Sequence, residues 1–311
     1  MARIIDSLKE SFIYKKIASS IHGLIVKINP AIEMNRVYYK TTNCKANIET
    51  PQNLIEKIFW LQLHTDTSMW SKCADKYAMR DYVKECGYES YLPKLLGKWD
   101  KASDIDFSSL PQSFILKTNN GCGTCCVVND KDSISEEGIK KQMKKHISIP
   151  YGWSGAQLHY TKIKPCIIAE ELLQIDNDQI KFSPQSLVDY KVWCFNGMPE
   201  NILVVYNRHN DMYNLDLYSV EWKRLEDKLM RNGHYCFSDF EIPRPDCLNE
   251  MLTMASKLSK PFPEVRVDFY VINSRPIIGE LTFTTGFGYF TKEYYDYLGG
   301  KVDLTNIKVV R

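Results

Sequence analysis

Two β-rich runs near the C-terminal end constrain the fold of this chain most strongly: residues 265–272 (VRVDFYVI) and 276–283 (PIIGELTF). The polar loop between them, Asn273, Ser274 and Arg275, predicts an antiparallel hairpin. Because side chains alternate faces along a strand, one face of this hairpin is continuously apolar. That face consists of Val265, Val267, Phe269, Val271, Ile277, Gly279, Leu281 and Phe283. The other face gathers Arg266, Asp268, Glu280 and Thr282.

The predicted polar face places Asp268 opposite Glu280, and Arg266 opposite Thr282. Two carboxylates directly opposite, with Cβ atoms about 5 Å apart, repel each other unless a cation lies between them. Mg²⁺ prefers oxygen ligands of this kind, usually one or two carboxylates completed by water and phosphate oxygens. The pattern therefore indicates a magnesium site. The alternative is a solvated polar face on which Arg266 neutralises one acid.

A Gly-containing loop follows the predicted strand 113–117, in the run FILKTNNGCGTCCVV. Glycines allow backbone N–H groups to approach an anion, and Lys117 at the strand end supplies a positive charge. The run lacks the Gly-Lys-Ser/Thr ending and the following helix of a Walker A loop, and it is not a dinucleotide fingerprint. It is a candidate phosphate loop, with an ordinary hairpin turn as the alternative.

The run DKYAMRDYVKECG predicts a helix that begins after Asp75 as N-cap and ends at Gly87. Lys76 would then occupy the first helical position, where a cation opposes the helix dipole. An anion bound at the same helix end would remove this conflict. A solvated lysine is the alternative interpretation.

The run KPCIIAEELL at 164–173 is an extended apolar segment that ends in two acids and two leucines. In isolation it is a strand edge. Beside a phosphate loop and a metal-binding face, it could be a hinge that offers backbone groups to adenine and a carboxylate to ribose.

The order of strands and helices predicts an α+β fold rather than a doubly wound parallel sheet, because consecutive strands read as antiparallel hairpins. Besides the final hairpin, strands are expected at 113–117, 125–129, 164–173, 189–195 and 201–207, and helices at 135–147 and 246–259.

Composition excludes some classes of protein. The 311 residues are 44 % hydrophobic and 25 % charged, with a formal net charge of +2, which argues against a disordered chain and against nonspecific nucleic-acid binding. The ten cysteines follow no framework spacing, so free thiols and a cytoplasmic location are expected. Cys122, Cys125 and Cys126 are not followed by a second Cys or His pair at a spacing that suits zinc. We therefore expect these cysteines to be small residues of a loop and a strand rather than zinc ligands.

Residues 3–25 predict an amphipathic helix. Its apolar positions are Ile4, Ile5, Leu8, Phe12, Ile17, Ile21 and Leu24, and they are expected to pack on the body of the protein. The alternative is peripheral contact with the inner face of the plasma membrane, because Arg3, Lys9, Lys15, Lys16 and Lys27 outnumber Asp6 and Glu10.

Taken in order, these runs resemble the ATP-grasp superfamily, and more closely its teichuronopeptide-biosynthesis-type (TupA-like) group. The resemblance spans about residues 50–300 and rests on ETPQNLIEKIFWLQ, ADKYAMRDYVKECG, IDFSSLPQSFILKTNNGCGT, DYKVWCFNG, FPEVRVDFYVIN and GELTFTTGFGYF. It implies two α+β lobes that sandwich ATP, after a mainly helical N-terminal region. The expected divisions are a helical region at 1–95, a small lobe at 96–168 and a large lobe at 169–311.

The resemblance also implies roles for individual residues. ATP would be bound by Lys76, Lys117, Gly121, Cys122, Gly123, Thr124, Glu170, Glu171, Leu172 and Leu173. Asp268 and Glu280 would ligate Mg²⁺. Thr282 stands where many members of the superfamily have Asn, and its hydroxyl would be a further ligand. Arg266 and Lys117 would act at the reacting centre, and Lys191 and Arg208 would bind the substrate.

The activity implied by the resemblance is ATP-dependent ligation of a carboxylate to an amine, with ATP and Mg²⁺ as cofactors. The substrate would be a small molecule or a glycan in bacterial surface-polysaccharide synthesis, with no role for nucleic acid. Two alternatives remain: an ATP-dependent kinase of a sugar or glycan, and a non-catalytic glycan-assembly protein or a glycosyltransferase.

Overall fold

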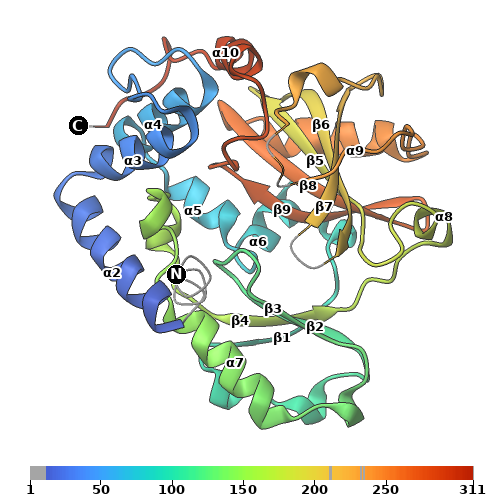
Figure 1. Ribbon diagram of the computed structural model, residues 1–311. Helices are drawn as coiled ribbons and strands as arrows, with labels where there is room; N and C mark the ends of the chain where they lie inside the picture. Colours follow the sequence, from blue (N-terminus) through green and yellow to red (C-terminus); the bar gives the residue numbers. More distant parts are fainter. Residues whose placement is uncertain (1–11, 210–211, 232, 234, 311) are drawn as a thin grey trace. The chain divides into compact units, whose positions relative to one another are not determined.

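The β-rich runs form two antiparallel sheets that lie in two separate units of the chain in the computed structural model (Figure 1). The structure describes residues 12–209, 212–231, 233 and 235–310. The first unit comprises Met1–Ile48, Gln62–Ala78 and Lys94–Leu172, and the second comprises Glu49–Leu61, Met79–Pro93 and Leu173–Arg311. The region expected as one helical segment at 1–95 is therefore shared between both units. The last division falls inside the run predicted as a hinge.

The first unit contains a four-stranded sheet with strand order β1-β4-β2-β3. Its strands are β1 (Leu95–Trp99), β2 (Phe114–Thr118), β3 (Cys125–Val128) and β4 (Ile167–Glu171). Its helices are α2 (Phe12–Ile28), α3 (Pro30–Thr42), α5 (Ser68–Ala74) and α7 (Glu136–Ser148). Short 3-10 helices are η2 (Ala102–Asp104), η3 (Phe107–Ser109), η4 (Lys131–Ser133), η5 (Trp153–Gly155) and η6 (Tyr160–Lys162).

The alternation of side chains along β2 divides this sheet into an apolar face and a polar face. Phe114 and Leu116 are buried on one face together with Ile139 and Met143 of α7. Helix α7 begins at a capped end, where the Ser135 hydroxyl accepts a hydrogen bond from the backbone N–H of Gly138. Lys117 has the opposite parity on β2, so the apolar packing of the sheet leaves its side chain on the other face.

The second unit contains a five-stranded sheet with strand order β7-β6-β5-β8-β9. Its strands are β5 (Asp189–Phe195), β6 (Met198–His209), β7 (Met212–Ser219), β8 (Glu264–Ile272) and β9 (Arg275–Thr282). Its helices are α6 (Met79–Glu85), α8 (Asn177–Ile180), α9 (Leu248–Ser259) and α10 (Lys292–Gly300), with 3-10 helices η1 (Glu89–Tyr91) and η7 (Glu226–Lys228). Helix α4 (Leu54–His64) begins in this unit and ends in the first.

Helix α9 covers the apolar face of the second sheet. It contacts β5, β6 and β8, and its buried side chains include Met251, Met254, Ala255 and Leu258. The facing residues of β8 are Val265, Val267 and Phe269, which are fully buried. Burial of this face leaves the alternate residues of β5, β8 and β9 on the opposite side of the sheet.

The closing hairpin (β8 and β9) has the predicted pairing at its polar residues, but its turn is one residue shorter than predicted and β9 contains a bulge. Its turn contains two residues, Asn273 and Ser274, both at positive φ as a type I′ turn requires. A register shift between Asp268 and Phe269, opposite Gly279, then adds one residue on β9. Asp268 consequently pairs with Glu280 and Arg266 with Thr282. The same bulge corrects the predicted apolar face: Ile278, which the prediction left off that face, pairs with Phe269 and is fully buried, whereas Ile277 pairs with Tyr270.

The α+β prediction is confirmed, and most expected strands and helices lie within a few residues of the observed ones. Strands β1 and β7 were missed. The helix expected at 246–259 begins two residues later, at Leu248 after Cys247, and it has no side-chain cap.

The expected packing of the N-terminal helix is wrong for its described part. Ile17, Ile21 and Leu24 are exposed, whereas Ser19 and Gly23 on the other face are buried. The earlier apolar positions of that prediction, in residues 3–11, lie outside the described residues.

Glu264 at the start of β8 is a buried acid whose two carboxylate oxygens have no hydrogen-bond partner among the described residues. Burial raises its pKa well above the ordinary value, and the charge of Arg266 offsets only part of this. Because the folded state then holds a proton that the unfolded state releases above about pH 4.3, stability falls as the pH rises, by up to about 1.4 kcal/mol per pH unit.

Replacing Glu264 by Met is therefore expected to stabilise the protein more at high pH than at low pH. We expect the free energy of unfolding to rise by about 2 kcal/mol at pH 8 and by much less at pH 5. Denaturant unfolding at both pH values measures this, with exposed Glu137→Met as the matched control. An equal loss of stability at the two pH values would contradict the prediction.

Candidate functional site

The residues predicted for the site gather into two groups, one in each unit. The first group surrounds the loop between β2 and β3, and the second covers the polar face of the five-stranded sheet. Leu173 is the exception, because it is the first residue of the second unit after the hinge run; every other residue of the first group lies in the first unit.

In the first unit, Lys76 contacts the predicted phosphate loop. Its Nζ donates to the carbonyl oxygen of Gly121 at 2.9 Å, and its backbone N–H donates to the carbonyl oxygen of Asn119, also at 2.9 Å. Lys76 is distant in the sequence from Lys117 and the glycine loop, but all three belong to one unit. The structure brings Lys76 and the loop together.

The helix expected to begin after Asp75 is corrected by these contacts. Helix α5 ends at Ala74, and α6 begins only at Met79. The Asp75 carboxylate still accepts hydrogen bonds from the backbone N–H groups of Tyr77 and Ala78, at 2.8 and 3.2 Å. Lys76 therefore lies in a turn bonded to the loop backbone, and not at a helix N-terminus.

The loop itself has a defined anchor and an exposed tip. The hydroxyls of Thr118 and Thr124 are hydrogen-bonded across its base at 2.6 Å. A Cβ at Gly121 would lie 2.3 Å from the Thr124 hydroxyl and 2.6 Å from that of Thr118, so only glycine fits there. Cys122 and Gly123 at the tip are exposed, and Gly123 has a φ of +66°. This arrangement leaves the tip backbone accessible to an anion.

Lys117 forms an ion pair with Glu170 on the polar face of the four-stranded sheet, with Nζ 2.5 Å from Oε2. Glu170 lies on β4, beside β2, and its side chain is only 3 % exposed. The next acid, Glu171, is exposed and accepts a hydrogen bond from the backbone N–H of Lys94 at 2.7 Å. Leu172 and Leu173 after it are half-buried. The two acids of the predicted hinge thus have different environments.

In the second unit, Asp268 is the centre of a charged group on the polar face. Arg266 donates to its two oxygens, from Nε to Oδ1 at 2.6 Å and from Nη2 to Oδ2 at 2.7 Å. Lys191 on the neighbouring strand β5 donates to Oδ2 at 2.5 Å. Arg266 also donates to the Thr282 hydroxyl at 3.1 Å. Four predicted site residues, Lys191, Arg266, Asp268 and Thr282, are therefore joined by direct hydrogen bonds.

These charges control one another's protonation. Burial alone would raise the pKa of Asp268, but the nearby Arg266 and Lys191 outweigh it and hold that pKa below its ordinary value. Burial lowers the pKa of Lys191, and Asp189 and Asp268 more than compensate, so the pKa is raised. Both groups are therefore charged at neutral pH. The buried face is held by ion pairs rather than by solvent.

The structure bears on both interpretations of the polar face, the magnesium site and the solvated face on which Arg266 neutralises one acid. Arg266 does neutralise Asp268, as the alternative supposed, but the face is not solvated, because both residues are less than 10 % exposed. Glu280 is half-buried opposite Asp268, and its charge contributes to the raised pKa of Arg266. The interpretation of Lys191 as a solvated strand lysine is likewise wrong.

Asp189 is the site residue that sequence reasoning missed. Its carboxylate lies 2.7 Å from Nζ of Lys191 and 3.2 Å from Nη2 of Arg208. It therefore links the two residues predicted to bind substrate. The signal was present in the sequence, since Asp189 stands two residues before Lys191 on one strand and must share its face.

The chemical character of this face can be compared with the needs of Mg²⁺. Asp268 and Glu280 carry hard oxygens at paired positions, and Thr282 carries a hydroxyl on the same face. Both oxygens of Asp268 and the Thr282 hydroxyl already accept hydrogen bonds from Arg266 or Lys191, so a bound ion would have to use their remaining lone pairs or displace these donors. Within the described residues, no three His, Cys, Asp or Glu side chains are grouped to hold a metal by themselves. Two carboxylates fit an ion that takes its remaining ligands from water and phosphate oxygens.

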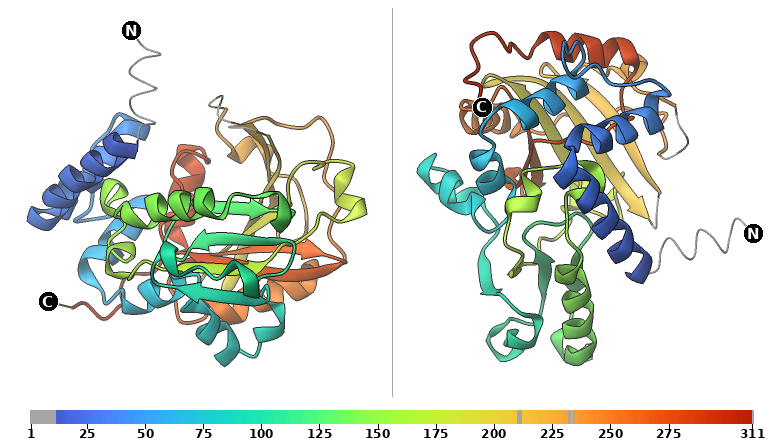
Figure 2. Two further views of the ribbon diagram at one scale, coloured as in Figure 1. Left: turned by 90° about the horizontal axis from the view of Figure 1, so that it is seen from below. Right: turned by 90° about the vertical axis from the view of Figure 1, so that its left-hand side faces the viewer.

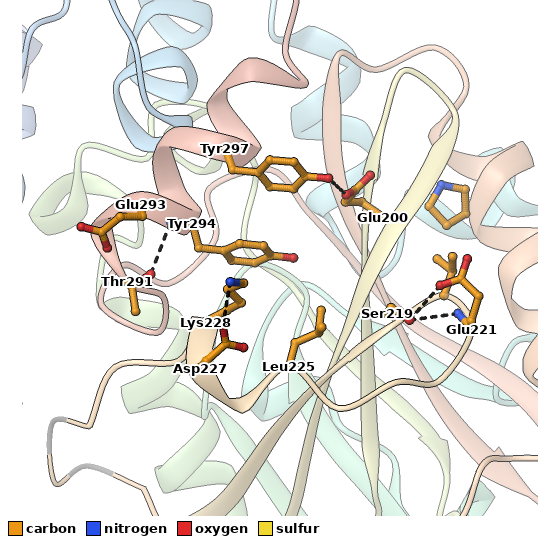
Figure 3. A pocket seen from close by; sticks show the side chains of 12 residues that line it. Glu200, Ser219, Glu221, Leu225, Asp227, Lys228, Thr291, Glu293, Tyr294 and Tyr297 are labelled. Atoms are coloured by element: carbon orange, nitrogen blue, oxygen red, sulfur yellow. Dashed lines mark hydrogen bonds and ion pairs between the residues drawn. The ribbon is translucent and has the colours of Figure 1, made fainter.

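A pocket elsewhere in the second unit is lined by residues from β6, β7, η7 and α10 (Figure 3). Tyr294 and Tyr297 of α10 stack with ring centroids 5.5 Å apart, and the Tyr297 hydroxyl donates to Glu200. Across the pocket, Lys228 pairs with Asp227 at 2.7 Å. The lining includes none of the residues predicted for the site.

A profile of the TupA-like ATPgrasp family matches residues 56–303. The chain belongs to this family. The matched residues include every predicted site residue of both groups, from Lys76 to Thr282. The predicted family and the ATP-grasp fold class are therefore confirmed. No curated protein matches the chain.

Solved structures of other proteins are similar to this ATP-grasp chain at low sequence identity. D-alanine–D-alanine ligase from Bacillus anthracis, complexed with ATP, is 17 % identical, with a TM-score of 0.39 and coverage of 72 % of this chain. L-amino acid ligase from Bacillus licheniformis is 12 % identical, with a TM-score of 0.42 and coverage of 71 % of this chain. The chain spans 58 % of the first protein and 45 % of the second. The assignment rests on the family match rather than on these similarities.

Proposed function

We propose that this member of the TupA-like ATPgrasp family is an ATP-dependent carboxylate–amine ligase. The observation that carries the proposal is the polar face of the five-stranded sheet, where Asp268 and Glu280 are paired beside Arg266 in an ATP-grasp chain. In the first unit, we propose the two lysines and the glycine loop as the phosphate-binding group.

The proposed reaction has two steps. A substrate carboxylate oxygen attacks the γ-phosphorus of ATP, which forms an acyl phosphate and releases ADP. An amine nitrogen then attacks the acyl carbon, inorganic phosphate leaves, and the nitrogen loses a proton to give an amide. A carboxylate is a poor electrophile at neutral pH, so phosphorylation supplies the leaving group. The protein mainly positions the reactants and balances charge.

On this proposal, Lys76, Lys117 and the loop from Gly121 through Cys122 and Gly123 to Thr124 bind the phosphates of ATP. Exposed Glu171 and the backbone of Leu172 and Leu173 bind ribose and adenine. Glu170 was assigned with them, but its carboxylate is buried against Lys117, and we propose that it positions that lysine.

In the second unit, Asp268, Glu280 and the Thr282 hydroxyl would hold Mg²⁺, which would supply positive charge to the phosphates when bound. Arg266 stabilises the negative charge that spreads over the transferred phosphoryl group. Arg208 is half-exposed and would bind the substrate carboxylate. Lys191 holds Asp189 and Asp268 in place, and we propose that it acts on the substrate through them.

The substrates are proposed from the family. An amino acid or another amine would be joined to the carboxylate of a uronic acid or an amino acid in a bacterial surface polysaccharide, such as capsule, O-antigen or teichuronopeptide. Because ATP is consumed, we propose that the reaction takes place in the cytoplasm.

Isotope transfer tests the proposal directly. The full chain is incubated with MgATP, a panel of amino acids and uronic-acid glycans whose carboxylates carry ¹⁸O. A ligase transfers one carboxylate ¹⁸O to inorganic phosphate for every amide formed, because that oxygen remains on phosphorus. A stable phosphoester without free phosphate would identify a kinase instead. Absence of MgATP binding by titration calorimetry would favour a non-catalytic protein.

A further inference from the structure

Helix α2 carries an apolar stripe that faces away from the rest of its unit. The stripe consists of Tyr14, Ile17, Ile21, Leu24 and Ile28, whose spacing of three and four residues places them along one side of the helix. Each is between 48 % and 83 % exposed. Ile32 and Tyr39 of the adjacent helix α3 are also more than half exposed. These seven residues are the largest concentration of exposed apolar side chains in the described part of the chain.

The opposite side of α2 explains why the stripe points outward. The Ser19 hydroxyl donates to the carbonyl oxygen of Pro150 at 2.6 Å, and Gly23 lies against the ring of Trp153 in η5. Small residues permit this close approach, and α2 lies beside this segment and α3 in Figures 1 and 2. The helix therefore packs through a face that includes Ser19, Gly23 and the buried Val26, and it leaves the five side chains of the stripe in contact with water.

The charge around the stripe is of one sign. Residues 12–42 contain five Lys or Arg and a single acid, Glu33. Glu33 is fully buried between His22 and Arg36, with oxygens 2.9 Å from His22 Nδ1 and 2.6 Å from Arg36 Nη2. Helix α2 itself has no acidic residue. Arg36 and Glu33 neutralise each other, and the exposed Lys16, Lys27 and Lys40 leave this surface positive.

We propose that α2 and α3 form a docking surface for an anionic lipid bilayer, with the stripe in the interface between headgroups and acyl chains. An exposed apolar face flanked by lysines is the pattern of helices that lie on membranes. No described helix is long and apolar enough to cross one.

A second copy of the chain fits the apolar stripe of α2 less well than an anionic bilayer does. Paired copies would bring the lysines of the two α2 helices close together, with no acid on α2 to pair with them.

Vesicle co-sedimentation of the full chain, without ATP, tests this proposal. We expect binding to phosphatidylcholine vesicles that contain about 30 % phosphatidylglycerol to be at least tenfold tighter than binding to phosphatidylcholine alone, and to weaken with salt. Two variants separate the contributions. Ile17→Ser/Leu24→Ser/Ile28→Ser should lower partitioning at least tenfold, and Lys16→Gln/Lys40→Gln should lower it roughly tenfold on anionic vesicles only.

The matched control is Met198→Ser/Met212→Ser/Val309→Ser, which removes three exposed apolar side chains of the second unit. It should bind vesicles like the unaltered chain. Equal binding to both vesicle types, or unchanged binding of the stripe variant, would overturn the proposal. So would a dimer, seen by sedimentation, that the stripe substitutions dissociate in the absence of any vesicle binding. Because no turnover is measured, these outcomes are independent of the ligase proposal.

Discussion

Replacing Asp268 by Asn together with Glu280 by Gln should abolish ADP release from MgATP. Both changes remove a negative oxygen donor from the paired positions of β8 and β9, where the proposed magnesium site lies. Loss of a preorganised electrostatic group typically costs about 100- to 1000-fold in rate, and two such losses bring turnover below detection. Coupled assay of ADP release measures the effect, and normal release would refute the metal assignment.

The two single variants should differ in their effect on stability. Asp268 is buried between Arg266 and Lys191, so Asp268→Asn leaves two buried cations with one fewer partner and should cost about 3–5 kcal/mol. Glu280 is more exposed than Asp268, so Glu280→Gln should cost less folding free energy than Asp268→Asn. Glu280→Gln is therefore the cleaner test of catalysis. Exposed Asp178→Asn is the matched control, which should leave both ADP release and thermal unfolding unchanged.

Replacing Lys117 by Met should both prevent ATP binding and destabilise the first unit. The proposed phosphate contact is lost, and Glu170 is left as a buried carboxylate without its cation. Breaking a buried ion pair from one side costs about 3–5 kcal/mol. Isothermal titration with MgATP and thermal unfolding measure the two effects separately.

The double variant Lys117→Met/Glu170→Gln distinguishes a structural role from a role in binding. Removal of the stranded carboxylate should restore most of the lost stability, whereas ATP affinity should stay low because the lysine is still absent. Recovery of affinity together with stability would show that Lys117 acts only through folding. Lys101→Met, at an exposed position, should change neither quantity.

Much of the second group of site residues could be read from the sequence because the information was local. Alternation along β8 and β9 placed Asp268 and Glu280 on one face, and the paired strands confirm it. The predicted three-residue loop was nevertheless wrong. A two-residue turn and the bulge at Gly279 lead to the same pairing, since the extra residue on β9 compensates for the shorter turn. Alternation alone does not reveal a bulge.

Other contacts depend on residues that are far apart in the chain. Lys76 is 45 residues from Gly121, and no spacing rule predicts that its Nζ would reach the Gly121 carbonyl. Glu170 looked available to ribose, but pairing of β2 with β4 places it beside Lys117 and buries it. The ion pair removes it from the set of ligand-binding groups. Such partners become visible only when the sheet order is known.

The sequence by itself was enough to predict the α+β class and the family. It was also enough to select the two lysines, the glycine loop and the paired acids as candidate site residues, because this selection depends on residue type and on alternation within a strand. Only the tertiary structure decided which charges neutralise one another, and that the large apolar residues of the α2 stripe face outward. Alternation and helical period state which residues share a face. The partner that covers that face is set by packing between segments distant in the chain, as when Gly23 admits Trp153 and turns Ile17 and Leu24 away.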